Sequence, residues 1–83
     1  LVHRVVAADQ LDAAVADVVR EALTAAPTGV AAAKRLIPQV AGRSPDEVAT
    51  LTARTIAAQR VSPEGQDGLR AFLEKRQPGW VPR

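Results

Sequence analysis

Few side chains in this sequence could take part in acid-base or metal chemistry. His3 is the only histidine, in an otherwise apolar stretch far along the chain from most acids. Asp46 and Glu47 are adjacent carboxylates, but neighbouring helical residues point about 100° apart, and both follow a Ser-Pro pair typical of a helix start. Gly65 and Gly68 lack the strand-turn-helix setting of a phosphate loop. We therefore interpret His3 as a solvated or hydrogen-bonded residue and the two acids as capping residues.

A group of cations near the end of the chain offers binding chemistry instead. Arg70, Lys75 and Arg76 lie close in sequence to Phe72, the only phenylalanine. An aromatic face beside an ammonium or guanidinium group suits a ligand that carries both a flat base and a phosphate. The same residues also fit an ordinary helix end, where Phe72 packs into a core and the cations complement the helix dipole.

The spacing of apolar residues predicts helices after a short lead-in. Residues 1–8 carry β-branched side chains typical of a short strand or an extended segment. From residue 9 the period is that of a helix, which we expect over residues 9–25, with a second over residues 28–40. Pro38 removes one backbone hydrogen bond of that second helix, so we expect it to kink or end near Ile37.

Two Ser-Pro pairs indicate where the last two helices start. Ser44 and Pro45 are followed by Glu47 at the third helical position, which is the pattern of a capping box. This helix is expected to end near residue 60 or 61. Ser62 and Pro63 repeat the start, and the final helix is predicted to run to residue 77, before a Pro-Gly pair. The sequence thus predicts an all-α chain of about four helices after the extended lead-in.

The composition limits the core that the chain can build. Of the residues, 47% are hydrophobic, but 17 of these are alanines and only two are aromatic. Alanine-surfaced helices pack closely against neighbours, so we expect the missing burial to come from a partner domain or subunit. The chain contains no methionine and opens on an apolar stretch. We therefore also expect it to be a segment of a longer protein.

Charge and cysteine content argue against several classes of partner. The net charge of +2 is weak for a protein that binds polyanions, so no nucleic acid is expected. The absence of cysteine excludes a disulfide framework and agrees with a reducing cytoplasmic compartment. No apolar run approaches the roughly 18 residues of a membrane span, so no membrane partner is expected.

Residues 62–80 form the most specific motif, with the sequence Ser-Pro-Glu-Gly-Gln-Asp-Gly-Leu-Arg-Ala-Phe-Leu-Glu-Lys-Arg-Gln-Pro-Gly-Trp. This motif resembles the C-terminal signature of the crotonase superfamily, the enoyl-CoA hydratases and isomerases. In that family a serine-led helix with a Glu-Gly step leads to an Ala-Phe-x-Glu-Lys-Arg-x-Pro run that closes on an aromatic residue. Residues 1–6 resemble the extended segment that leaves the family's spiral core, and residues 33–35 resemble a step in its second C-terminal helix.

The resemblance implies an α/β spiral of ββα units followed by a helical region that builds a trimer or a dimer of trimers. It assigns residues 1–8 to the segment leaving a missing spiral core and residues 9–83 to the helical oligomerisation region. The implied reaction adds water across the 2,3-double bond of an acyl-CoA thioester. Its oxyanion hole and glutamates belong to the missing N-terminal catalytic domain, so this chain carries no catalytic residue. No metal or prosthetic group is implied, and coenzyme A enters as part of the substrate.

One role can be transferred residue by residue, which is the coenzyme contact. Phe72 and Lys75 match the family's phenylalanine and lysine that approach the adenine and the ribose phosphate, commonly in the active site of a neighbouring subunit. Arg76 and Ile56 are secondary candidates for the same region. The stretch from Arg60 is most similar to hydratases that act on branched or methylglutaconyl-type thioesters.

Two other functions fit the same sequence. Residues 31–40, a turn at residues 41–43 and the helix from Ser44 imitate a helix-turn-helix DNA-binding module. Asp46 and Glu47 oppose this hypothesis, because they place negative charge where a recognition helix would meet phosphates. A purely structural module for helical association also fits the alanine-rich composition.

Overall fold

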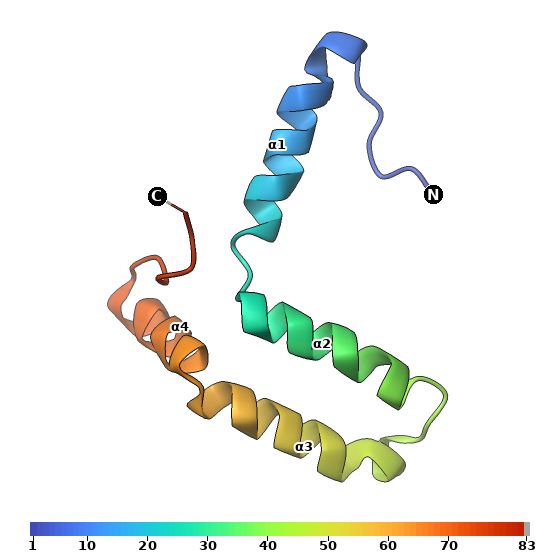
Figure 1. Ribbon diagram of the computed structural model, residues 1–83, viewed down its shortest axis with the longest axis vertical. Coiled ribbons are helices and arrows are strands. Elements are labelled where there is room, and N and C mark those ends of the chain that lie inside the picture. Colours follow the sequence, from blue (N-terminus) through green and yellow to red (C-terminus); the bar gives the residue numbers. More distant parts are fainter. Residues whose placement is uncertain (83) are drawn as a thin grey trace.

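The chain forms four α-helices joined by short turns. The computed structural model describes residues 1–82, and no β-strand occurs among them. After an extended start, the elements are a 3-10 turn η1 (Ala8–Gln10), α1 (Leu11–Ala22), α2 (Pro27–Val40), α3 (Pro45–Val61) and α4 (Pro63–Glu74) (Figure 1). The all-α prediction is confirmed for the described residues. Of the two alternatives for the lead-in, the structure contains the extended segment, which has no second strand to pair with.

Two helix ends differ from the sequence prediction, and Pro38 does not end its helix. α1 ends at Ala22 rather than at residue 25. α2 ends at Val40, as predicted, and the alternative of an end near Ile37 is wrong, because the helix continues through Pro38. A proline so close to the end of a helix removes only one of its last hydrogen bonds. α4 ends at Glu74, three residues before the predicted end, because the next residue adopts a left-handed backbone.

The capping box at the start of α3 is confirmed. Ser44 Oγ accepts a hydrogen bond from the Glu47 backbone N–H at 3.3 Å, and Glu47 Oε2 accepts one from the Ser44 backbone N–H at 3.2 Å. Asp46 lies in the same first turn. These contacts satisfy two of the backbone donors that a helix start leaves unpaired, so they explain why α3 begins where it does.

α2 has no capping side chain of its own and takes one from α4. Its N-cap residue, Ala26, offers no side-chain acceptor. The Glu64 carboxylate accepts instead from the backbone N–H groups of Thr28, at 3.0 Å, and Gly29, at 3.1 Å. The Thr28 hydroxyl and, at 3.3 Å, Gln59 Nε2 also donate to it. These bonds lower the pKa of Glu64, and the bond from the Thr28 hydroxyl contributes most. They also hold the start of α2 against the start of α4.

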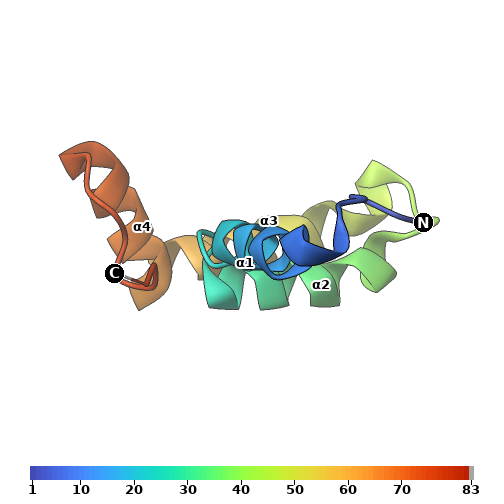
Figure 2. The same cartoon turned by 90° about the horizontal axis from the view of Figure 1, so that it is seen from above.

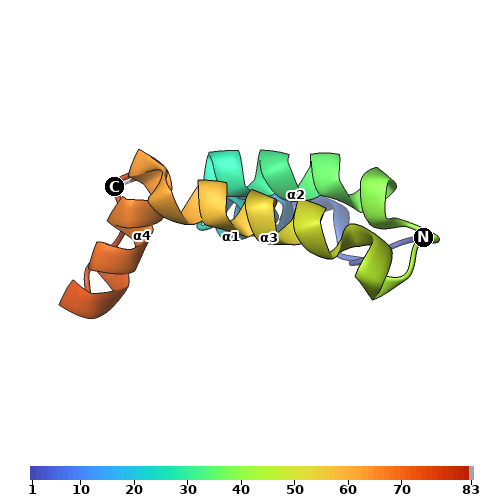
Figure 3. The ribbon, with the colours of Figure 1, turned by 90° about the horizontal axis from the view of Figure 1, so that it is seen from below.

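The helices are arranged as an open layer rather than a bundle. α2 and α3 lie side by side and antiparallel, α4 turns away from the end of α3, and α1 projects from the start of α2 (Figures 1 and 3). Seen from above, the molecule is thin, with α4 tilted out of the layer (Figure 2). Its extents are 49 × 37 × 15 Å, so its shortest dimension is less than a third of its longest.

This layer has almost no core. Val48 and Ala71 are its buried hydrophobic residues. The accessible surface is 7038 Å², against about 4,700 Å² for a compact protein of this mass, and the radius of gyration is 16.8 Å against about 12 Å. At least sixteen large apolar side chains are exposed in the described chain. The fold therefore leaves large apolar faces exposed in the described part of the chain.

Candidate functional site

The position of α4 is set by a sharp corner at its start. Ser62 caps the helix, because its Oγ accepts from the Gly65 backbone N–H at 3.0 Å and donates to the Gln59 carbonyl oxygen at 2.7 Å. Pro63 takes the first helical position, where no backbone N–H is needed. A Cβ on Gly65 would lie 3.0 Å from the Gln59 carbonyl carbon and 3.2 Å from the Arg60 carbonyl oxygen. The corner thus requires glycine at this position.

The outer face of α4 presents Phe72 to solvent. Ala71 is 1% exposed, whereas Phe72 is 82% exposed and Leu73 is 78% exposed. Burying a large apolar side chain stabilises a protein by about 1.5–3 kcal/mol, and neither Phe72 nor Leu73 contributes this stabilisation within the described chain. The alternative in which Phe72 packs into a core is therefore wrong for this chain. Its ring is accessible to a ligand or to another protein surface.

Lys75 lies directly after α4, in an unusual backbone conformation. Its φ and ψ are 54° and 40°, which is the left-handed region that usually holds glycine. The Arg76 N–H donates to the Ala71 carbonyl oxygen at 3.0 Å, and the Lys75 N–H donates to the Phe72 carbonyl oxygen at 3.3 Å, which together form a Schellman motif. Lys75 is exposed, and its ammonium group makes no ion pair within residues 1–82.

Arg76, a secondary candidate for the coenzyme site, is occupied by carboxylates. Its Nη2 lies 2.8 Å from Asp67 Oδ1 and its Nε lies 2.6 Å from Glu74 Oε2. Asp67 Oδ2 also accepts from the Gly79 backbone N–H at 2.6 Å. The Gly79 amide, followed by Arg76, lowers the pKa of Asp67, while Glu74, followed by Asp67, raises the pKa of Arg76. Arg76 thus fixes the tail against α4, and Lys75 is the neighbouring cation left without a carboxylate.

Trp80 connects this tail to α1. Its indole Nε1 donates to the Thr24 carbonyl oxygen, just after α1, at 3.0 Å. The ring lies against Gly68 of α4, where a Cβ would come within 2.9 Å of Trp80 Cη2. Gly68 therefore provides the space for the indole. These Trp80 contacts hold the C-terminal end of α1 near α4, while the rest of α1 projects from the layer (Figure 1).

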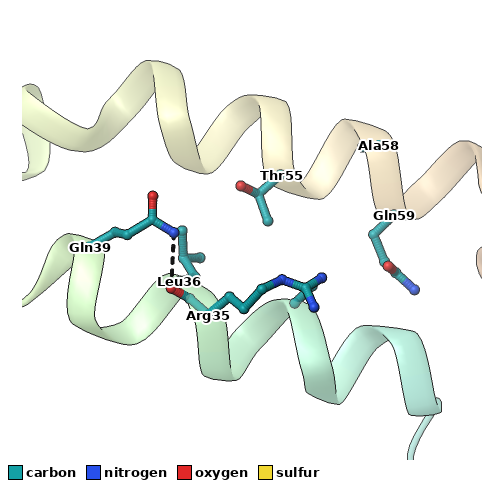
Figure 4. A pocket seen from close by; sticks show the side chains of 7 residues that line it. Arg35, Leu36, Gln39, Thr55, Ala58 and Gln59 are labelled. Carbon is teal, nitrogen blue, oxygen red and sulfur yellow. Dashed lines mark hydrogen bonds between the residues drawn. The ribbon is translucent and has the colours of Figure 1, made fainter.

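Ile56, the other secondary candidate, lies away from α4. It is 66% exposed and lines an apolar groove of about 430 Å³ between α2 and α3. A second, more polar groove of about 280 Å³ contains Arg35 and Gln39, with Gln39 Nε2 donating to the Arg35 carbonyl oxygen at 2.9 Å (Figure 4). On α2, Gly29 and Ala33 line only the apolar groove, whereas Arg35 and Gln39 line only the polar one. These two pairs lie on opposite sides of the helix, so the two grooves occupy opposite faces of the layer.

His3 and the acidic side chains form no catalytic or metal-binding cluster in the described part of the chain. His3 is exposed in the extended lead-in. Within the described chain, no group of three or more His, Cys, Asp or Glu side chains is placed to hold a metal ion. Across the same residues, each helix is too short or too polar to cross a membrane.

No protein-family model, curated protein or solved structure matches this chain. The likeness of residues 62–80 to the crotonase family is therefore a resemblance of sequence, and what it implies about function is a proposal. The geometry that bears on this proposal is the exposed Phe72 with Lys75 beyond it at the end of α4.

Sequence reasoning missed two residues that position this site. Glu64 follows the Ser-Pro start of α4 and no role was predicted for it, yet it caps α2. The available signal was Ala26, because an uncapped helix start needs an acceptor from elsewhere. Trp80 follows a Pro-Gly turn, and its bond to Thr24 spans 56 residues, which no local pattern indicates.

Proposed function

We propose that this chain is the C-terminal helical segment of an enoyl-CoA hydratase-like enzyme, where it serves subunit assembly and completes the coenzyme A site. The reaction of that enzyme is the addition of water to the 2,3-double bond of an acyl-CoA thioester. The observation that carries the proposal is Phe72, the only phenylalanine. It is 82% exposed, stands three residues before a lysine that has no ion pair among residues 1–82, and lies in the run that resembles the family signature.

The chemistry of these two side chains suits the adenosine end of coenzyme A. An exposed phenyl ring can stack on adenine, a contact worth about 1–3 kcal/mol when measured by removal of the aromatic ring. The Lys75 ammonium group can pair with the ribose phosphate as a charge-assisted contact. A non-glycine residue in the left-handed region costs on the order of 1 kcal/mol, so a lysine at this position supports a role for its side chain.

The open layer supports the assembly half of the proposal. A chain with two buried hydrophobic residues and a large exposed apolar surface gains stability by covering that surface with other subunits or domains. We propose a trimer, or a dimer of trimers, as the assembled form. The oxyanion hole and the catalytic glutamates are proposed to lie in a separate catalytic domain.

The helix-turn-helix alternative is disfavoured by the arrangement of α2 and α3. These helices run antiparallel and side by side, whereas the helices of that motif cross at roughly 90–120° (Figure 3). The start of α3 also carries Asp46 and Glu47. The second candidate that an observation favours is a purely structural association module, because the exposed apolar faces alone would suffice for it.

Titration of the parent protein with acetyl-CoA separates the two candidates. We expect Phe72→Ala to raise the Kd about tenfold, as for a lost stacking contact. Lys75→Ala should also raise it, and should reduce the preference for acetyl-CoA over its 3′-dephospho form. Arg54→Ala is the control, because it removes an exposed cation from α3, outside the proposed site, and we expect it to change the Kd less than about twofold. Unchanged affinity in both test variants, with assembly intact, would leave only the association module.

A further inference from the structure

The apolar stripe of α1 projects from the layer and is bordered by acids. Its large side chains are about half exposed, and they are Leu11, Val15, Val18, Val19 and Leu23. Asp12 lies one turn before Val15, and Glu21 lies one turn after Val18. Asp17 is paired with Arg20 at 2.7 Å and lies 4.0 Å from Arg4, whereas Asp12 and Glu21 make no ion pair in the described chain.

The apolar groove between α2 and α3 has the complementary pattern. Ile56 of α3 lines the groove and is exposed, and the exposed Val30 and Ile37 of α2 directly follow the lining residues Gly29 and Leu36 in sequence. Lys34 lies one turn from both α2 residues, and Arg60 lies one turn from Ile56, so each helix carries a cation close to its exposed apolar side chains. Neither cation is ion-paired among residues 1–82. α2 contains no acid at all, while α1 carries three acids and one arginine.

The spacing of the charges agrees with a helix lying in this groove. Asp12 and Glu21 are nine residues apart, which is about 13 Å along α1. Gln59 Nε2 donates to Thr28 Oγ at 3.2 Å, so Arg60 lies level with the start of α2. Lys34 is six residues after Thr28, so Lys34 and Arg60 are separated by about 9 Å along the helix axes. The difference of about 4 Å is within the reach of lysine and arginine side chains.

The chain cannot place α1 in its own groove in this arrangement. The bond from Trp80 Nε1 to the Thr24 carbonyl oxygen holds the base of α1, and the helix runs away from α2 and α3 (Figure 1). The accessible surface exceeds that of a compact protein of this mass by roughly 2,300 Å². A standard interface buries about 800 Å² on each partner, so one arm and one groove per copy fit within this excess.

We propose that α1 of one copy lies in the α2–α3 groove of a second copy, with Asp12 and Glu21 opposite Lys34 and Arg60. The inference rests on the assembly part of the proposed function and is independent of the coenzyme contact. Because arm and groove are different surfaces, the contact can repeat head-to-tail from copy to copy, and it forms a closed ring where the rotation between copies permits. A ring of three agrees with the proposed trimer.

Charge reversal tests this contact by sedimentation velocity of the purified protein. Asp12→Lys with Glu21→Lys, and separately Lys34→Glu with Arg60→Glu, should each weaken self-association at least tenfold. Combining all four substitutions should restore it. Arg35→Glu with Arg43→Glu is the matched control, because it makes the same change of charge away from the apolar groove, and we expect no effect. Circular dichroism checks that helix content is unchanged in every variant.

The outcomes also separate this contact from the proposed function. If the wild-type protein assembles and the reversals leave its mass unchanged, or if the fourfold variant stays dissociated, the arm-in-groove contact is wrong and assembly through another surface stands. If the wild-type protein is monomeric at every concentration tested, both the contact and the assembly role are wrong. The acetyl-CoA titration is read separately in either case.

Discussion

The corner between α3 and α4 makes a sharp prediction about two glycines in equivalent positions. Gly29 and Gly65 are each the third residue of a helix that begins with proline. A Cβ on Gly29 would lie 3.5 Å from both Ala26 Cβ and Gln59 Nε2, which is ordinary contact. A Cβ on Gly65 would lie far inside van der Waals contact with the Gln59 carbonyl oxygen. The same substitution should therefore have opposite effects.

The magnitudes follow from two opposing contributions. Replacing a helical glycine by alanine stabilises a protein by about 0.4–1 kcal/mol where the backbone allows it. Gly29→Ala should therefore raise the free energy of unfolding by about 0.5 kcal/mol. Gly65→Ala gains the same amount but must displace backbone atoms of α3, a rearrangement that costs about 1–3 kcal/mol. We expect a net loss of about 1–2 kcal/mol.

Thermal unfolding followed by far-ultraviolet circular dichroism measures both changes. One kcal/mol corresponds to roughly 4–8 °C in Tm for a domain of 60–100 residues. Gly29→Ala should raise the Tm by a few degrees, and Gly65→Ala should lower it by about 10 °C, at equal protein concentration because assembly contributes to Tm. Gly68→Ala should fall between them, since the Trp80 indole that it would meet can move. A Gly65→Ala variant as stable as the wild type would refute the described corner.

Three further predictions concern the bonds that hold the helices. The pKa of Glu64 is lowered by hydrogen bonds, of which the one from the Thr28 hydroxyl contributes most. The Glu64 carboxylate therefore stabilises the folded chain fully above its ordinary pKa of 4.5, and this stabilisation is lost as the pH falls through the lowered pKa. Glu64→Gln should flatten this acid dependence of Tm. Ser44→Ala should cost about 1 kcal/mol in chemical denaturation, as for a lost N-cap. Trp80→Phe, which loses the bond to the Thr24 carbonyl oxygen, should speed amide exchange at the end of α1 at least severalfold.

Local signals in the sequence predicted the helix starts well. Ser44, Pro45 and Glu47 lie within four residues of one another, so their mutual contacts depend on little else, and the capping box forms as expected. The effect of Pro38 was less predictable, because its cost depends on how many turns follow it. The sequence prediction also placed the end of α4 three residues too late. Nothing in the sequence indicates that Lys75, rather than a glycine, takes the left-handed position.

Contacts between distant residues account for the rest. Apolar spacing identified the stripe of α1, but periodicity describes one helix and says nothing about what covers it. The cap that Glu64 gives to Thr28 spans 36 residues. The exposure of Phe72 likewise depends on where the corner directs α4. The resemblance of residues 62–80 singled out Phe72 and Lys75, and the structure adds that Arg76 is already paired.

Phe72 as the coenzyme contact is the central claim, and one labelling experiment tests it directly. Phe72 is the only phenylalanine in these 83 residues, so comparing the parent protein, ¹³C-labelled at phenylalanine, with its Phe72→Leu variant assigns the Phe72 ring signals in the nuclear magnetic resonance spectrum. At saturating coenzyme A, we predict intermolecular Overhauser effects between the Phe72 ring protons and the adenine protons. An unshifted Phe72 resonance without such effects, at a concentration where calorimetry shows the coenzyme to be bound, would contradict the claim.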